Sequence, residues 1–165
     1  MGDLIMQLPY TKGCFVCGAQ NPHGLALRFR IVGNEVHGDF TPQPQHAGFR
    51  GIIHGGIVST VLDEVMIWAA AVTMKRFCVA ADLNVRFLKR VSVGQPYLLV
   101  GKLEADRGRI WESSGELRDA TGLVYARATS KQVPLKLADL KSLTEDFLPD
   151  PATATVAALF PDLIS

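Results

Sequence analysis

His54, Gly55 and Gly56 stand at the start of the longest apolar stretch of the sequence. Two glycines at a helix N-terminus leave backbone N–H groups unpaired, and the missing Cβ atoms let a ligand approach closely. The helix dipole adds partial positive charge at the same point. Such a terminus can stabilise an oxyanion that develops when a carbonyl group is attacked. A Gly-Gly pair that only permits a tight turn would look the same, so the spacing alone leaves both interpretations open.

Asp63 lies nine residues after His54, inside the apolar stretch. Burial of a carboxylate raises its pKa toward the range that suits a general base. The neighbouring Glu64 leaves open that one side of this helix is exposed to solvent and that Asp63 lies on that exposed edge. Consecutive helical residues point about 100° apart, so at most one of the two acids faces a given site.

The distance between Gly55 and Asp63 constrains any site that uses both. They are eight residues apart, which is ~12 Å along a helix axis at a rise of 1.5 Å per residue. One carbonyl group cannot contact both residues. The site therefore needs Gly55 from one subunit and Asp63 from an antiparallel copy of the helix, which predicts a two-fold homodimer with two sites at its interface.

Hydrophobic patterning predicts the elements that position these residues. The apolar stretch indicates a helix from about His54 to Met74, apolar on nearly every side and hence surrounded by protein. Alternation of apolar and polar residues predicts strands, with Val79, Ala81, Leu83, Val85 and Phe87 sharing one face of the third. The strand ranges are Leu25–Ile31, Val36–Phe40, Val79–Phe87, Pro96–Glu104, Ile110–Leu117 and Leu123–Val133.

Turn residues separate these strands at Gly33-Asn34, at 106–108 and at 119–122, and residues 41–51 read as a loop. A lone apolar helix needs a sheet around it, so the predicted fold class is α+β, an antiparallel sheet wrapped around one long central helix. We expect an N-terminal arm over residues 1–24, this domain over 25–137, and a partly helical tail over 138–165.

Composition excludes several function classes. The chain is 48% hydrophobic and 20% charged, as in globular proteins, and its net charge of +1 with no dense Lys/Arg cluster argues against nucleic acid as a partner. Asp63 and Glu64 argue against membrane insertion of the apolar helix, because an acid at the centre of a span costs ~2.5–3.5 kcal/mol. Three cysteines without a secretory signal favour a cytoplasmic protein.

Cys14 and Cys17 have the spacing of half a zinc site. The other candidate ligands are His23, His37, His46 and Cys78, and they form no second pair at regular spacing. The sequence therefore predicts no metal, and a reduced turn pair that packs the arm. A thioredoxin-like role lacks its βαβ context.

The run F-R-G-I-I-H-G-G-I-V-S-T-V-L-D-E-V-M (Phe49–Met66) resembles the signature of hotdog-fold thioesterases of the phenylacetyl-CoA and 4-hydroxybenzoyl-CoA type. In that signature H-G-G is followed, after six further residues, by the catalytic acid. C-F-V-C-G-A-Q-N-P-H-G-L-A-L-R-F (Cys14–Phe29) resembles the approach to the first strand in a bacterial subgroup. A-D-L-N-V-R-F-L-K-R-V-S-V-G (Ala81–Gly94) resembles the strand and turn after the helix.

This resemblance, over Cys14 to Val133, implies a hotdog fold with a five- or six-stranded sheet, paired as a homodimer or a dimer of dimers. It implies hydrolysis of an acyl-CoA to the free acid and CoA, with no cofactor beyond the CoA of the substrate. The Gly55 N–H would polarise the thioester carbonyl beside Gly56. Asp63 would act as general base or nucleophile, with Glu64 as the other candidate acid, and His54 would line the carbonyl or hold the turn.

Arg86, Lys89 and Arg90 follow the third strand, where basic side chains at the mouth of the site would bind the CoA phosphates; ordinary surface charge is the alternative. Two positions depart from the family pattern. Some relatives place Asn where this chain has Gly48, a role that His46 could take, and many carry Ser or Thr near Ala80.

These departures leave a second interpretation open, a non-catalytic module that binds acyl-CoA or another small ligand. A hotdog hydratase or dehydratase ranks lower, because the helix start shows no Asp/His pairing of the hydratase kind.

Overall fold

The computed structural model describes residues 5–163, so the first four residues of the predicted arm and the last two of the tail lie outside the described residues. One long helix, α1 (Gly55–Met74), carries the glycines and both acids. The strands are β1 (Ile5–Gln7), β2 (Phe29–Val32), β3 (Glu35–Phe40), β4 (Ala47–Phe49), β5 (Ile52–Ile53), β6 (Cys78–Phe87), β7 (Tyr97–Asp106), β8 (Trp111–Arg118) and β9 (Val124–Pro134). The short helices are η1 (Pro44–His46), α2 (Leu137–Thr144), α3 (Val156–Leu159) and η2 (Pro161–Leu163).

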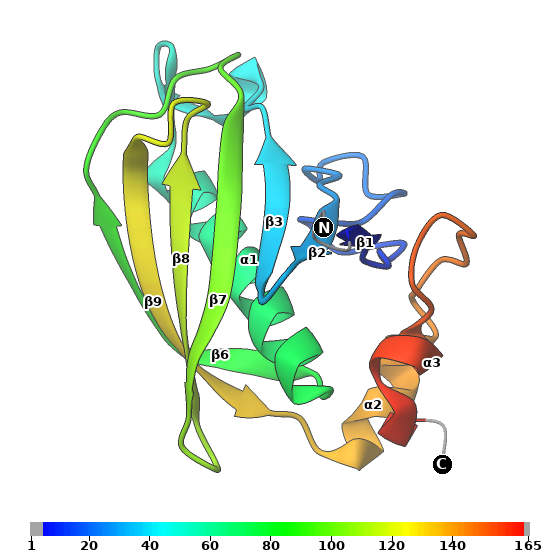
Figure 1. The fold of residues 1–165 in the computed structure, drawn as a ribbon. Coiled ribbons are helices and arrows are strands. Elements are labelled where there is room, and N and C mark those ends of the chain that lie inside the picture. The colour runs from blue at the N-terminus through cyan, green and yellow to red at the C-terminus, as the bar shows by residue number, and fades with distance from the viewer. Residues whose placement is uncertain (1–4, 164–165) are drawn as a thin grey trace.

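The main sheet is antiparallel and has seven strands in the order β1-β2-β3-β7-β8-β9-β6. It curves around α1, as Figure 1 shows, and confirms the predicted α+β architecture. The seventh strand beyond the expected five or six comes from the arm, where β1 pairs with β2. Its three residues are all exposed, so β1 has no buried face that would give the sequence an alternation of apolar and polar residues.

Helix α1 is the core of the domain, as its all-round apolar character predicts. Only Gly56 and Thr73 among its 20 residues are exposed. By length and composition alone it could span a membrane, but its apolar residues pack against the sheet. The helix ends at Lys75, whose left-handed backbone (φ 54°) stops the helical hydrogen bonding.

Two paired glycines let the sheet approach the helix closely. Gly101 of β7 faces Gly115 of β8 in the strand register. A Cβ on Gly101 would overlap the backbone carbonyl of Val65, and a Cβ on Gly115 would meet the Met66 side chain at 3.0 Å. The backbone of α1 therefore rests against the backbone of the sheet at Val65, two residues beyond Asp63.

The structure corrects two strand predictions and one loop. The predicted strand Leu25–Ile31 starts only at Phe29, because Ala26 adopts a left-handed conformation (φ 51°) that breaks the extended chain. The predicted loop 41–51 contains η1 and β4, which pairs with β5.

The predicted face of the third strand is also wrong at one end. A register shift between Ala80 and Asp82 places a bulge at Ala81. Leu83, Val85 and Phe87 oppose the buried Ser130, Ala128 and Ala126, whereas Val79 opposes the exposed Val133. The bulge has turned Val79 to the outer face, since one extra residue reverses strand alternation.

Strand β6 is the edge of the sheet, with a hydrogen-bonded neighbour on only one side within the described chain. Nearly all of it is exposed, including the apolar side chains of Val79, Leu83 and Phe87. A long exposed edge with apolar side chains is a surface to which a further strand can pair.

The arm and the tail dock on each other at the end of the sheet opposite β6, as Figure 1 shows. The Leu148 N–H donates to the Tyr10 carbonyl at 3.0 Å, and the Tyr10 hydroxyl donates to Asp150 at 2.9 Å. Phe160 of the tail is fully buried and packs on Phe77, with ring centroids 4.1 Å apart. Phe147 of the tail also contacts Trp68 in the C-terminal half of α1, with ring centroids 6.2 Å apart.

Candidate active site

The N-terminus of α1 presents one free backbone donor. His54 is the N-cap, with an extended backbone (φ −61°, ψ 133°), and its Nδ1 accepts the N–H of Gly56 at 2.9 Å. The N–H groups of Ile57 and Val58 both donate to the His54 carbonyl. The Gly55 N–H has no hydrogen-bond acceptor in the described part of the chain, so it is the donor available to a ligand.

A cavity of about 510 Å³ opens onto this donor. Its lining is mostly apolar: Gly48, Phe49, Ile52, Ile53, His54, Gly55, Val58, Phe87, Leu88, Lys89, Arg90 and Val91. Phe87 lies against Gly55, where an added Cβ would sit 3.3 Å from the ring. The cavity can therefore hold an apolar group directly above a helix N-terminus. Phe87 was not among the predicted site residues, because an apolar residue at a strand end normally signals only burial.

The three predicted basic residues are not all brought together. Lys89 and Arg90 line this cavity. Arg86 points to the outer face of the sheet, into a polar depression shared with Glu116 and Arg127. Strand alternation separates Arg86 from Phe87 and hence from the cavity.

Asp63 is distant from this cavity in the same chain and does not line it. Its Oδ1 is buried and has no hydrogen-bond partner among the described residues. Burial raises the pKa of Asp63. Burial, with the nearby Asp63 charge, also raises the pKa of Cys78 to about 12. A buried carboxylate oxygen without a partner is unusual, because such groups are normally hydrogen-bonded.

Glu64 points away from Asp63, toward the arm. Its carboxylate lies 3.9 Å from the Sγ of Cys14. Burial, followed by the nearby Cys14 and Asp63, raises the pKa of Glu64 to about 8. The two acids thus lie in separate surroundings, as their angular spacing predicts.

Two further residues that the sequence singled out, His46 and Gly48, lie in the segment before α1 and pack there. His46 packs on Phe40, its Nδ1 accepts the Gln43 N–H at 3.0 Å, and its carbonyl accepts the His54 N–H at 2.9 Å. Gly48 packs on His54, where an added Cβ would lie 3.2 Å from the imidazole. Ala80 opposes the buried Gln132 on the inner face of the sheet.

Buried polar side chains face the helix from the inner side of the sheet, and the sequence reasoning missed them. Ser113 donates to Gln132 at 3.0 Å, and both are buried, as is Ser130. The Ser130 hydroxyl and the Gln132 amide nitrogen have no partner among the described residues. The strand alternation of Ser130 and Gln132 with Thr129, Lys131 and Val133 was the available signal.

Comparison with known protein families matches residues 50–126 to the family described as the thioesterase superfamily. That range includes the helix, the glycines, both acids and β6 to β8. A comparison with curated protein sequences gave no match.

Solved structures share the fold. A thioesterase superfamily protein is 25% identical, with a TM-score of 0.68 over 74% of this chain, which spans only 63% of that protein. The E. coli PaaI protein, from the phenylacetic acid degradation operon, is 14% identical, with a TM-score of 0.62 over 68% of this chain and 81% of PaaI. A Streptococcus mutans protein bound to acetyl-CoA is 17% identical, with a TM-score of 0.58 over 62% of this chain and 82% of that one.

Proposed function

We propose that the protein is an acyl-CoA thioesterase that hydrolyses a thioester to a free acid and CoA, a proposal supported by the match of residues 50–126 to the thioesterase superfamily. Gly55 of one subunit provides the oxyanion donor, and Asp63 of the other subunit activates water or attacks the carbonyl. The observation that carries the proposal is the unpaired Gly55 N–H at the floor of an apolar cavity.

The charge developing on the thioester oxygen suits this donor. A preorganised N–H at a helix N-terminus stabilises negative charge without reorganising, and its worth grows where water is excluded. His54 contributes by accepting the Gly56 N–H, which fixes the turn and leaves the Gly55 N–H facing the cavity. The apolar lining fits an acyl group, and Lys89 and Arg90 are suitably charged for the CoA phosphates.

Asp63 can serve this donor only from a second subunit. The offset of eight residues from Gly55 to Asp63 amounts to ~12 Å of helix. The exposed β6 edge supports pairing of two sheets, which would bring the two helices side by side. The unpartnered Oδ1 of Asp63 would then face the cavity of the partner.

Two routes are consistent with this arrangement. In one, the Asp63 carboxylate takes a proton from water as the water oxygen adds to the carbonyl carbon. The Gly55 N–H holds the resulting oxyanion, whose collapse breaks the C–S bond, and the proton passes to the departing CoA thiolate. In the other, the Asp63 carboxylate attacks directly and expels CoA as a thiolate, which gains a proton from water, and the acyl anhydride is then hydrolysed.

The Asp63→Asn variant tests the proposal against short, long and aromatic acyl-CoA substrates. We expect turnover to fall by ~10²–10⁴-fold, the usual contribution of a positioned acid–base group. The fold and subunit assembly should stay intact, as checked by circular dichroism and light scattering. Hydrolysis retained by Asp63→Asn would refute the mechanism or move the acid role to Glu64, which Glu64→Gln would then show.

A second candidate function is an acyl-CoA binding module without turnover. It is favoured by Gly48, where some relatives place an Asn that holds water or substrate, and by Ala80, near which relatives often carry Ser or Thr. The same panel of acyl-CoA substrates separates the two functions, because tight binding without hydrolysis by the unaltered chain would support the module.

A further inference from the structure

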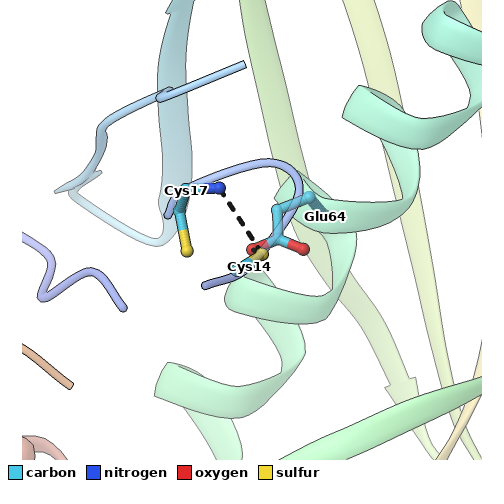
Figure 2. A group of neighbouring side chains, drawn as sticks. All are labelled: Cys14, Cys17 and Glu64. Atoms are coloured by element: carbon cyan, nitrogen blue, oxygen red, sulfur yellow. Dashed lines mark hydrogen bonds between the residues drawn. The ribbon is translucent and has the colours of Figure 1, made fainter. Parts of the chain in front are cut away.

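A cluster of potential metal ligands lies outside the cavity, at the junction of the arm and α1. Cys14, Cys17 and Glu64 each offer one ligand atom there, and these atoms lie within 4.8 Å of one another. Figure 2 shows Cys14 and Cys17 on a turn of the arm and Glu64 reaching them from the helix. The three residues come from segments 50 positions apart in sequence.

The turn from Cys14 to Cys17 directs backbone N–H groups at the sulfur of Cys14. The N–H groups of Val16 and Cys17 donate to the Cys14 Sγ at 3.3 and 3.5 Å, and the Gly18 N–H donates to the Cys14 carbonyl at 2.9 Å. Gly18 is required for this turn, because an added Cβ would overlap the Cys14 carbonyl oxygen. Backbone N–H groups directed at a sulfur stabilise negative charge on it, as a metal-bound thiolate requires.

Glu64 supplies what the cysteine spacing lacks. It lies on a helix whose neighbouring positions Val61, Leu62 and Val65 are fully buried, and it forms none of the ion pairs in the described part of the chain. A charged carboxylate is costly to hold in such surroundings, so the group must either take up a proton or be neutralised by a cation. A cation between the carboxylate and the two sulfurs would satisfy all three groups at once.

We propose that Cys14, Cys17 and Glu64 bind one zinc ion that ties the N-terminal arm to helix α1. Two thiolates and one carboxylate form a zinc-type ligand set, since soft sulfur ligands select zinc over magnesium or calcium. Three protein ligands leave one tetrahedral position for water. The ion neutralises Glu64 next to Asp63 and holds the arm over the helix.

The sequence prediction of no metal rested on the lack of a second cysteine or histidine pair. The third ligand is instead an acid on the helix, which the fold brings to the cysteines. A redox dithiol is the competing use of Cys14 and Cys17, whereas a cation also accounts for the carboxylate oxygen that lies within 4.8 Å of both sulfurs.

The test measures metal in the full-length protein purified without chelators. We expect one zinc per chain by elemental mass spectrometry and, after exchange with Co²⁺, a thiolate-to-cobalt charge-transfer band in the near ultraviolet. Cys14→Ser, Cys17→Ser and Glu64→Gln should each weaken Zn²⁺ affinity by more than roughly tenfold. Losing a residue that only hydrogen-bonds to a metal ligand already weakens affinity by about that much. Zn²⁺ competition with a chromophoric chelator measures that affinity.

Cys78→Ala is the matched control, because Cys78 is a buried cysteine outside the cluster, and it should retain one zinc per chain. Circular dichroism of each variant separates loss of metal from loss of fold, and the Co²⁺ spectrum of the unaltered chain needs no variant. Absence of both zinc and the cobalt band would overturn the proposal. So would a Cys14–Cys17 disulfide in the purified chain, or unchanged Zn²⁺ affinity in Glu64→Gln.

Discussion

The imidazole Nδ1 of His54 accepts the backbone N–H of Gly56 at 2.9 Å. This bond assigns different tasks to two adjacent glycines that the sequence does not distinguish. The Gly56 N–H is used internally to cap the helix, and the Gly55 N–H stays available to a ligand. The histidine thus fixes the turn that leaves the Gly55 N–H directed at the cavity.

Replacing Gly55 by proline removes the donor with little cost to the helix. Proline is favoured at the first helical position, and the extended backbone of His54 (φ −61°, ψ 133°) suits a residue that precedes proline. We expect kcat for acyl-CoA hydrolysis to fall by ~10²–10³-fold, as when other oxyanion donors are removed.

Gly55→Ala is the control for this substitution, because it keeps the N–H and adds only a methyl group 3.3 Å from the Phe87 ring. Its loss of kcat should be much smaller. Equal kcat values in the proline and alanine variants would show that the N–H does not stabilise the transition state.

Basic residues around β6 should differ in their effect on substrate binding. Lys89 and Arg90 line the cavity, whereas Arg86 lies on the opposite face of the sheet. We expect Lys89→Gln and Arg90→Gln each to raise KM for acyl-CoA by up to ~10-fold, with kcat unchanged, because a phosphate contact contributes equally before and during reaction. Arg86→Gln serves as the internal control. A KM increase confined to Arg86→Gln would contradict this placement of the CoA phosphates.

A charge on the edge strand should separate the subunits. Leu83→Lys places a positive charge on the exposed β6 edge, where two copies would meet. We expect light scattering to report a monomer and hydrolysis to be lost together with the dimer. Leu123→Lys is the matched control, since Leu123 is comparably exposed but lies in the turn between β8 and β9. An active Leu83→Lys monomer would show that one chain suffices.

Acidification should weaken the loop before α1 through His46. Burial lowers the pKa of His46 from its ordinary 6.5, and its neutral Nδ1 accepts the Gln43 N–H. Because the folded pKa is lower than the unfolded one, this contribution to stability is complete above pH ~6.5 and is lost as pH falls through the folded value. Thermal unfolding midpoints measured between pH 7.5 and 5 should fall more for the unaltered chain than for His46→Gln. Parallel pH profiles would exclude His46.

Periodicity was sufficient to predict α1 and the strands that pack on it, but not the β4–β5 pair that lines the cavity. The helix ends fall where the sequence places them, because Gly-Gly and the apolar stretch define one continuous element. Strands β7, β8 and β9 match within two residues for the same reason. The face of Val79 was not predictable, since a bulge at Ala81 depends on pairing with β9 and leaves no local signal.

The candidate site could be proposed from the sequence as a set of residues but not as a set of contacts. The H-G-G motif and Asp63 came from their spacing together with the family resemblance, and the expectation of two chains came from helix geometry. Which glycine keeps its N–H free depends on the rotamer of His54. The separation of Arg86 from Lys89 depends on where β6 ends, because Arg86 lies in the strand and points to its outer face, whereas Lys89 follows the strand and lines the cavity. The contact between Glu64 and Cys14 joins segments that only the tertiary fold brings together.

Mixed dimers of two inactive variants test the central claim that each site takes Gly55 and Asp63 from different chains. Gly55→Pro and Asp63→Asn homodimers should both be inactive, since every site in each has one defect. A mixed dimer has one site with both residues intact, so unfolding and refolding equal amounts together should restore about one quarter of the unaltered activity. Mixed dimers that form, as counted by native mass spectrometry of differently tagged chains, yet remain inactive would contradict a site shared between subunits.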